Sequence, residues 1–199
     1  MKRLRTVALV ARQAGLIVLN DALLEHPSIE LVSVYTHAKL PNAEGGGRRP
    51  EAALFENACK TAGVPLAFLD FPEAKHLELH LPAGNIDLVV AVSWRFLVST
   101  SVLDRLRFGA LNLHRGALPE YAGAEPIRRA IEAGERRVAI TAHRMTSDID
   151  GGPIVSVVWM DINPLPPGGD SYAYAEEIKK RLEPLYAPLV RTAIAAIVA

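Results

Sequence analysis

The sequence is poor in several features that define large classes of proteins. Its 199 residues include one cysteine, Cys59, so no disulfide can form within the chain. Lysine and arginine together number 22, as do aspartate and glutamate, whereas a nucleic-acid-binding protein usually carries a basic excess. No apolar run is long enough to cross a bilayer, and the basic start lacks the apolar region of a signal peptide. These absences predict a cytoplasmic protein without a membrane or nucleic-acid partner.

The sequence does contain a regular alternation of strand-like and helix-like segments. Strands are expected in the first part at residues 6–11, 30–36, 66–69, 86–92 and 109–113. Helices are expected between them, the clearest at 15–25, 50–62 and 99–106. This alternation is typical of a parallel sheet covered by helices.

The later part has a different pattern. A helix at 124–133 precedes two strands, 138–144 and 154–161, and a last helix runs from residue 171 with possible kinks at Pro184 and Pro188. Half of the residues are hydrophobic, which suits one well-buried domain of this length. We therefore predict an α/β fold in a single Rossmann-like domain over residues 1–199. It would have a mostly parallel twisted sheet, helices on both faces and a late antiparallel extension.

Two polar side chains stand where the fifth predicted strand ends. Asn112 and His114 are two residues apart, so in a strand they point to one face while Leu113 points to the other. Ligands of open α/β sheets bind at the carboxyl ends of the strands. There, an amide beside an imidazole can stabilise an oxyanion and transfer a proton. The alternative is that loop backbone satisfies both side chains.

A glycine-rich turn, DIDGGP, joins the last two predicted strands. Asp150 precedes two glycines, which let a backbone turn sharply and approach a ligand. Asp150 is then either a turn former or an acid that fixes the tautomer of His114 and raises the pKa of that histidine.

Two further positions are candidates for a binding site. Trp94 and Phe96 follow the 86–92 strand, where they can line a pocket for an aromatic ligand or cover the edge of the core. His143 alternates with Ala142 on a predicted strand, so it faces either a site or a hydrogen-bonded core.

Taken in order, the segments LNLHRGALPEYAGAEPIRRAI, ITAHRM and DIDGGPIV resemble the folate-dependent formyltransferase family. That family includes glycinamide ribonucleotide transformylase, the catalytic domain of methionyl-tRNA formyltransferase, and sugar N-formyltransferases. Its pattern is Asn-x-His, Leu-Pro-x-x-x-Gly and a later Asp-x-Gly. Here Asn112 and His114, the turn 118–123, and Asp150 with Gly152 match it. The convincing match spans about residues 86–159.

The resemblance implies transfer of a formyl group from 10-formyltetrahydrofolate to an amine. Asn112 and protonated His114 would stabilise the tetrahedral oxyanion, while Asp150 keeps His114 charged and routes protons to the leaving nitrogen. The donor is expected among residues of two loops: Ser93, Trp94, Arg95, Phe96, Leu97, Met145, Asp148 and Ile149. The acceptor is expected near Arg12, Arg115, Gly116 and His143.

Departures from the family pattern bear on the acceptor. Gly116 replaces a usual serine, and the loop after the first strand lacks the glycine-rich phosphate loop of the glycinamide ribonucleotide enzymes. We expect no β-barrel domain for transfer RNA after the last helix. We therefore expect a small-molecule amine, such as an amino-sugar nucleotide. Glycinamide ribonucleotide transfer and hydrolysis of the donor stay open.

Other classes of protein share some of these features. A nicotinamide dehydrogenase would carry G-x-G-x-x-G after the first strand, and this chain does not. His114, His143 and Asp150 resemble a two-histidine, one-carboxylate metal set, although we expect no metal. A non-enzymatic ligand-binding member is a further alternative. Residues 157–160 and the last helix can form a homodimer face or core.

Overall fold

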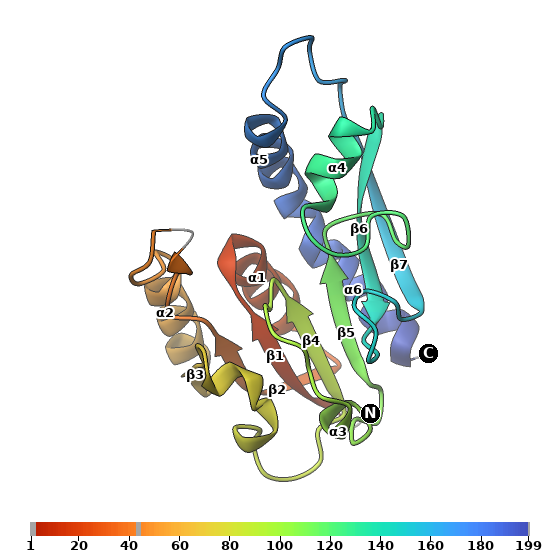
Figure 1. The fold of residues 1–199 in the computed structure, drawn as a ribbon. Coiled ribbons are helices and arrows are strands. Elements are labelled where there is room, and N and C mark those ends of the chain that lie inside the picture. Colours follow the sequence, from red (N-terminus) through yellow and green to blue (C-terminus); the bar gives the residue numbers. More distant parts are fainter. Residues whose placement is uncertain (1–2, 43–44, 199) are drawn as a thin grey trace. The chain divides into compact units, whose positions relative to one another are not determined.

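The computed structural model describes residues 3–42 and 45–198. Contacts between residues divide the chain into two compact units, 1–111 and 112–199. The strand β5 (Ala110–His114) belongs to both, because its first two residues lie in unit 1 and its last three in unit 2. Figure 1 shows the elements of each unit along the colour scale.

The sheet of unit 1 is parallel. It contains β1 (Leu4–Val10), β2 (Ile29–Thr36), β3 (Leu66–Phe68) and β4 (Leu88–Val92), in the neighbour order β3-β2-β1-β4. All three pairings of these strands are parallel. Every residue of β4 is buried, which explains why this strand reads as an unbroken apolar run.

The helices of unit 1 differ from the predicted ranges mainly at their ends. The first helix, α1 (Arg12–Val18), continues as a π-helical segment, η1 (Leu19–Leu23). Two further α-helices are α2 (Ala52–Ala62) and α3 (Thr100–Leu103). Between them lie two 3₁₀ turns, η3 (Glu73–Lys75) and η4 (Leu77–Leu79). Gly63 ends α2 with a φ of +67°, a left-handed conformation that is typical of a glycine after the last helical residue. The predicted helix 99–106 is too long, because Arg105 and Leu106 make turn-type bonds three residues back.

Unit 2 contains the antiparallel part of the fold. After β5 come α4 (Pro126–Glu132), β6 (Arg137–Arg144) and β7 (Ile154–Asp161), and the strand order is β5-β6-β7. β6 and β7 pair antiparallel, with Arg137 opposite Asp161. The parallel sheet of unit 1 and this pair confirm the predicted α/β class and its late antiparallel extension.

The C-terminal segment is interrupted at one of its two prolines. Asp170 accepts hydrogen bonds from the first turn of α5 (Ser171–Leu182), a standard N-cap. A 3₁₀ turn, η5 (Glu183–Leu185), contains Pro184 and separates α5 from α6 (Tyr186–Val198). Pro188 lies in the first turn of α6, where a missing N–H costs no helical bond. The helix α6 therefore continues through Pro188.

Cys59 is 1% exposed within α2, as expected for a core residue. Among the described residues, no helix combines the length and the apolar character needed to cross a membrane.

Candidate active site

Asn112 and His114 lie on the part of β5 that belongs to unit 2. Strand alternation places both on one face, and Leu113 between them is 4% exposed. His114 itself is 8% exposed, so its imidazole is largely removed from water. These positions agree with the predicted juxtaposition.

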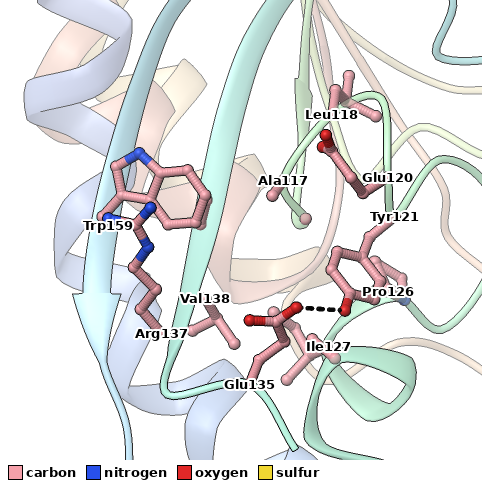
Figure 2. A pocket seen from close by; sticks show the side chains of 13 residues that line it. Ala117, Leu118, Glu120, Tyr121, Pro126, Ile127, Glu135, Arg137, Val138 and Trp159 are labelled. Carbon is pink, nitrogen blue, oxygen red and sulfur yellow. Dashed lines mark hydrogen bonds between the residues drawn. The ribbon is translucent and has the colours of Figure 1, made fainter. Parts of the chain in front are cut away.

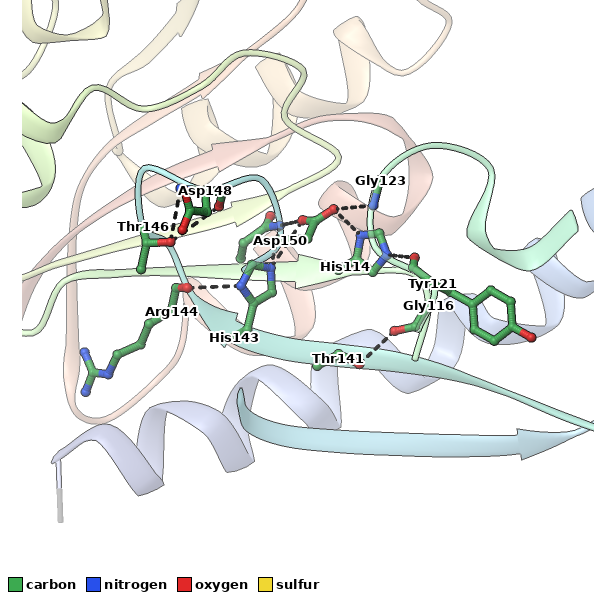
Figure 3. Close-up of polar contacts among 11 residues, drawn as sticks. His114, Gly116, Tyr121, Gly123, Thr141, His143, Arg144, Thr146, Asp148 and Asp150 are labelled. Atoms are coloured by element: carbon green, nitrogen blue, oxygen red, sulfur yellow. Dashed lines mark hydrogen bonds and ion pairs between the residues drawn. The ribbon is translucent and has the colours of Figure 1, made fainter. Parts of the chain in front are cut away.

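The carboxylate of Asp150 is the centre of a polar cluster (Figure 3). Its Oδ2 lies 3.1 Å from Nδ1 of His114 and accepts the backbone N–H of Gly123 at 3.0 Å. Its Oδ1 lies 3.4 Å from Nδ2 of Asn112 and 3.5 Å from Nε2 of His143. The structure therefore brings Asn112, His114, His143 and Asp150 together, which the sequence pattern could only suggest.

The backbone at Asp150 is itself unusual. Its φ is +52°, in the left-handed region that residues with a side chain rarely adopt. Directly after it, a Cβ at Gly152 would lie 1.8 Å from the carbonyl oxygen of Arg144. The Asp-Gly-Gly sequence is thus needed for the turn, and this turn aims the carboxylate at His114. Asp150 therefore forms the turn and also contacts His114.

Both ring nitrogens of His114 face acceptors. Nδ1 faces the Asp150 carboxylate, and Nε2 lies 2.8 Å from the carbonyl oxygen of Tyr121. Because neither partner carries a proton, only the imidazolium would satisfy both contacts. Burial nevertheless lowers the pKa of His114 below 6.5, outweighing the Tyr121 carbonyl and the Asp150 charge, which raise it. This corrects the expectation that Asp150 keeps His114 charged: at neutral pH the folded site favours a neutral ring.

The electrostatics of Asp150 follow from its partners. Burial alone would raise the pKa of Asp150, but hydrogen bonds from His143 and the Gly123 N–H, with the nearby histidine charges, lower it overall. Asp150 is therefore a carboxylate at neutral pH. A fixed anion beside a neutral histidine is the arrangement that favours a proton moving onto that histidine.

The two ring nitrogens of His143 have different surroundings. Its Nδ1 lies 3.0 Å from the carbonyl oxygen of Arg144. Its Nε2 lies 3.1 Å from Nδ2 of Asn112, which can donate to it. His143 is 2% exposed, so it acts here as a buried partner that orients the Asn112 amide.

The loop after His114 contributes groups that the residue pattern did not identify. The Tyr121 carbonyl and the Gly123 N–H both bind the cluster, and Thr141 donates to the carbonyl of Gly116 at 2.7 Å. All but the Thr141 hydroxyl are backbone atoms, so residue identity says little about them. The glycine that ends the Leu-Pro-x-x-x-Gly pattern was the available sequence signal. This residue, Gly123, has a φ of +83°, which favours glycine.

Arg115 and Gly116 occupy different surroundings. The charge of Arg115 acts on the fully buried phenol of Tyr186 in α6. A Cβ at Gly116 would lie 2.6 Å from Cβ of Pro126 and 2.9 Å from Nε2 of His114, so a side chain there has no room. The glycine in place of the usual serine is thus matched to the observed position of His114.

A pocket of about 380 Å³ lies beside the same loop (Figure 2). The Tyr121 hydroxyl donates to Glu135 at 2.9 Å, and the Arg137 guanidinium lies 4.2 Å from the centre of the Trp159 ring. Gly116 also lines this pocket, so its wall and the surroundings of His114 share one loop. Its volume is within the range of small-molecule sites.

The expected donor-binding residues belong to both units. In unit 2, Met145 is half-buried, while Asp148 and Ile149 are exposed on the turn before Asp150. In unit 1, the segment Ser93–Leu97 follows β4, and Leu97 is 67% exposed. Each of these loops therefore carries one exposed apolar side chain, Leu97 in unit 1 and Ile149 in unit 2.

Two of the unit 1 positions have strained backbones. Ser93, which directly follows β4, has a φ of +57°, and Arg12, two residues after the end of β1, has a φ of +62°. A residue with a side chain keeps such a backbone conformation only where the surrounding structure holds it. Residues of this kind are frequent at active sites and ligand-binding sites. Trp94 packs on His37 at a ring-centre distance of 4.2 Å, so this indole is held by its neighbours.

A metal site would need three ligand side chains arranged around one ion. Within residues 3–42 and 45–198, no group of three histidine, cysteine or acidic side chains is arranged to hold a metal ion. The contacts of His114, His143 and Asp150 are hydrogen bonds and ion pairs with one another.

The fold is shared with known enzymes. Glycinamide ribonucleotide transformylase 1 from Geobacillus kaustophilus superposes with a TM-score of 0.71 at 18% identity, covering 96% of both chains. A formyltetrahydrofolate deformylase from Pseudomonas putida KT2440 gives 0.67 at 20% identity, covering 96% of this chain and 64% of that one. At these identities the similarity concerns the fold.

Sequence comparison identifies the family. A methionyl-tRNA formyltransferase from Methylobacterium sp. (strain 4-46) is 32% identical over 171 residues, which is 84% of this chain. The match covers 51% of that enzyme, so the chain spans about half the length of such relatives. The family model described as formyl transferase matches residues 6–181. The chain therefore belongs to the formyl transferase family.

Proposed function

We propose that residues 1–199 act as one catalytic domain that transfers a formyl group from 10-formyltetrahydrofolate to an amine. The observation that carries this proposal is the cluster of Asn112, His114 and Asp150, with Nδ1 of His114 at 3.1 Å from Asp150. Amine formylation needs a donor for an oxyanion and a group that accepts and returns one proton, and this cluster contains both.

The proposed chemistry is an addition followed by an elimination. The amine nitrogen attacks the formyl carbon, a C–N bond forms, and the formyl oxygen becomes an oxyanion. Asn112 donates its amide hydrogen to that oxygen. Neutral His114 takes one proton from the attacking nitrogen, and the Asp150 carboxylate stabilises the imidazolium that results.

The return of the proton completes the turnover. His114 passes its proton to N10 of the folate as the bond between N10 and the formyl carbon breaks. The oxyanion collapses to the formamide carbonyl, and His114 is neutral again. The lowered pKa of His114 suits this role, because the resting ring must be able to accept the proton.

We propose a small-molecule amine as acceptor, with amino-sugar nucleotides as the first candidates. The pocket of about 380 Å³ beside the His114 loop supports a ligand of this class. Arg137 offers it a cation for an anionic group. Arg137→Ala should raise the KM for the acceptor while leaving donor affinity unchanged. A cytoplasmic location and a homodimer stay predictions.

The test begins with the donor. Calorimetry should show micromolar or tighter binding of a stable 10-formyltetrahydrofolate analogue. Formylation is then measured with amino-sugar nucleotides, glycinamide ribonucleotide and methionyl-tRNA, and formate release is measured without an amine. His114→Ala should abolish transfer, while His76→Gln, whose side chain is 61% exposed, should not.

Each outcome has a definite meaning. Transfer to one amine establishes the reaction and its acceptor. Formate release without transfer to any amine would make the protein a hydrolase of the donor. A folded wild-type sample that binds no analogue would overturn the proposal.

A further inference from the structure

A buried histidine outside the catalytic cluster has a defined set of contacts. His37 directly follows β2 in unit 1 and is 1% exposed. Its Nδ1 lies 2.6 Å from the carbonyl oxygen of Leu69. A carbonyl only accepts, so the proton of neutral His37 is on Nδ1. Its Nε2 is buried and has no hydrogen-bond partner among the described residues.

The remaining contacts of His37 are with two aromatic rings of the segment after β4. The imidazole stacks on Trp94 with ring centres 4.2 Å apart and planes 22° apart. Phe96 meets the imidazole edge-on at 5.5 Å and the indole at 6.3 Å. The three rings therefore contact one another in the geometries that aromatic pairs prefer.

The indole of Trp94 is held by stacking. Its Nε1 is buried without a hydrogen-bond partner in the part of the chain that the structure describes. An unbonded buried N–H is costly, so the ring stays there only because its packing compensates. The chief directional contact of Trp94 is thus the His37 ring.

The surroundings keep His37 neutral. Burial lowers the pKa of His37 to about 4, the Leu69 carbonyl and Asp70 oppose this, and Arg95 and Arg49 add to it. An imidazolium would place a second N–H on Nε2, where no described acceptor lies. A neutral ring stacks on indole without having to bury a charge.

The backbone next to Trp94 needs such support. Ser93 has a φ of +57°, and a residue with a side chain persists in that region only where its surroundings hold it. Ser93 joins β4 to the indole, so fixing the indole fixes the exit from the strand. The anchor runs from the Leu69 carbonyl through His37 to Trp94.

We propose that His37 is a positioning residue for the segment 93–98: its imidazole, bound to the Leu69 carbonyl, stacks on Trp94 and holds the segment in its ligand-binding shape. The inference rests on the proposed function, because the ligand proposed for this segment is the folate donor. His37 itself touches neither donor nor acceptor in this role.

Two substitutions separate the parts of the anchor. His37→Phe keeps a ring for Trp94 and removes the donor to Leu69, whereas His37→Asn keeps a donor and removes the ring. The signal is the indole N–H resonance of Trp94, which ring currents shift. The chain has two tryptophans, so a Trp159→Phe background leaves that one signal.

The ring-deleted variant should lose the anchor. In His37→Asn the Trp94 resonance should move toward the position of a free indole, and the Kd for the donor analogue should rise tenfold or more. His37→Phe keeps the ring and loses only the Leu69 bond, so it should shift the resonance and raise the Kd less than His37→Asn does. The control His76→Gln should change neither quantity.

The opposite results would overturn the inference. If His37→Asn lowers the melting temperature but leaves the Trp94 resonance and the Kd unchanged, His37 is only a packing residue. Should that variant fail to fold, His37→Gln replaces it with the same expectations.

The resonance is recorded without folate, so it tests the anchor independently of the proposed function. A shifted resonance in a protein whose wild type binds no analogue supports the anchor and overturns the assigned ligand.

Discussion

The imidazole Nδ1 of His114 lies 3.1 Å from Oδ2 of Asp150. This contact joins the end of β5 to the turn before β7, and the Gly123 N–H binds the same oxygen at 3.0 Å. The strained φ of +52° at Asp150 is held by these contacts. The pair is therefore built into the fold of unit 2.

Asp150→Asn should separate shape from charge. The amide has nearly the size of the carboxylate, but it removes the negative charge that raises the pKa of His114. The pKa of His114 should then fall further, because its imidazolium loses its counter-ion. Formyl transfer should slow by about 10²–10⁴-fold, the usual contribution of positioned acid–base groups. NMR titration and single-turnover assays measure the two effects.

Asp161→Asn is the matched control, because Asp161 is exposed at the far end of β7. It should leave both the histidine titration and the transfer rate at wild-type values. Unchanged transfer in Asp150→Asn, with the donor still bound, would remove Asp150 from the mechanism.

Gly116→Ala should disturb His114 through a steric clash. The new Cβ would meet Cβ of Pro126 at 2.6 Å and Nε2 of His114 at 2.9 Å, and the proline ring cannot rotate away. We expect the free energy of unfolding to fall by about 1–3 kcal/mol, as for other overpacked sites. Urea denaturation measures this loss, and the NMR signals of His114 should shift.

Ala117→Ser serves as the control for Gly116→Ala, because residue 117 is half-buried. It should cost less than 0.5 kcal/mol, roughly the range of substitutions away from the core. If Gly116→Ala is as stable as wild type and the His114 signals do not shift, the loop can move enough to accommodate the added Cβ.

Much of the fold could be predicted from the sequence because its buried strands are short apolar runs. The apolar run of β4 indicates a strand buried on both faces, and the glycine after α2 indicates a helix end. Helix ends were less predictable, because α1 begins at Arg12 without a side-chain cap and is fixed by its neighbours.

The candidate site was predictable in its side chains and not in its backbone. Strand alternation placed Asn112 beside His114, and the motif order pointed to Asp150. The carbonyl of Tyr121 was invisible, because any residue supplies a carbonyl. Asp150 raises the pKa of His114 as predicted, but burial, which only the assembled unit determines, lowers it by more.

Cys59 should be inert in the native protein. It is 1% exposed, and burial raises the pKa of its thiol to about 11, so almost no thiolate exists at neutral pH. A thiol reagent should modify it only after addition of urea. Cys59→Ser should keep full transfer activity, and rapid labelling of the folded protein would contradict the assigned burial.

The stability of the protein should depend on pH through His37. Its pKa is about 4 in the folded chain against 6.5 for an ordinary histidine, so the unfolded chain binds more protons between these values. The contribution of His37 is then complete above pH 6.5 and is lost as the pH falls toward 4, by about 2 kcal/mol at pH 5. His37→Phe keeps a ring and cannot titrate. Between pH 7 and pH 5, urea denaturation should show wild type losing about 2 kcal/mol more than His37→Phe. Equal losses would mean that His37 keeps an ordinary pKa and that its Nε2 is not shielded from water.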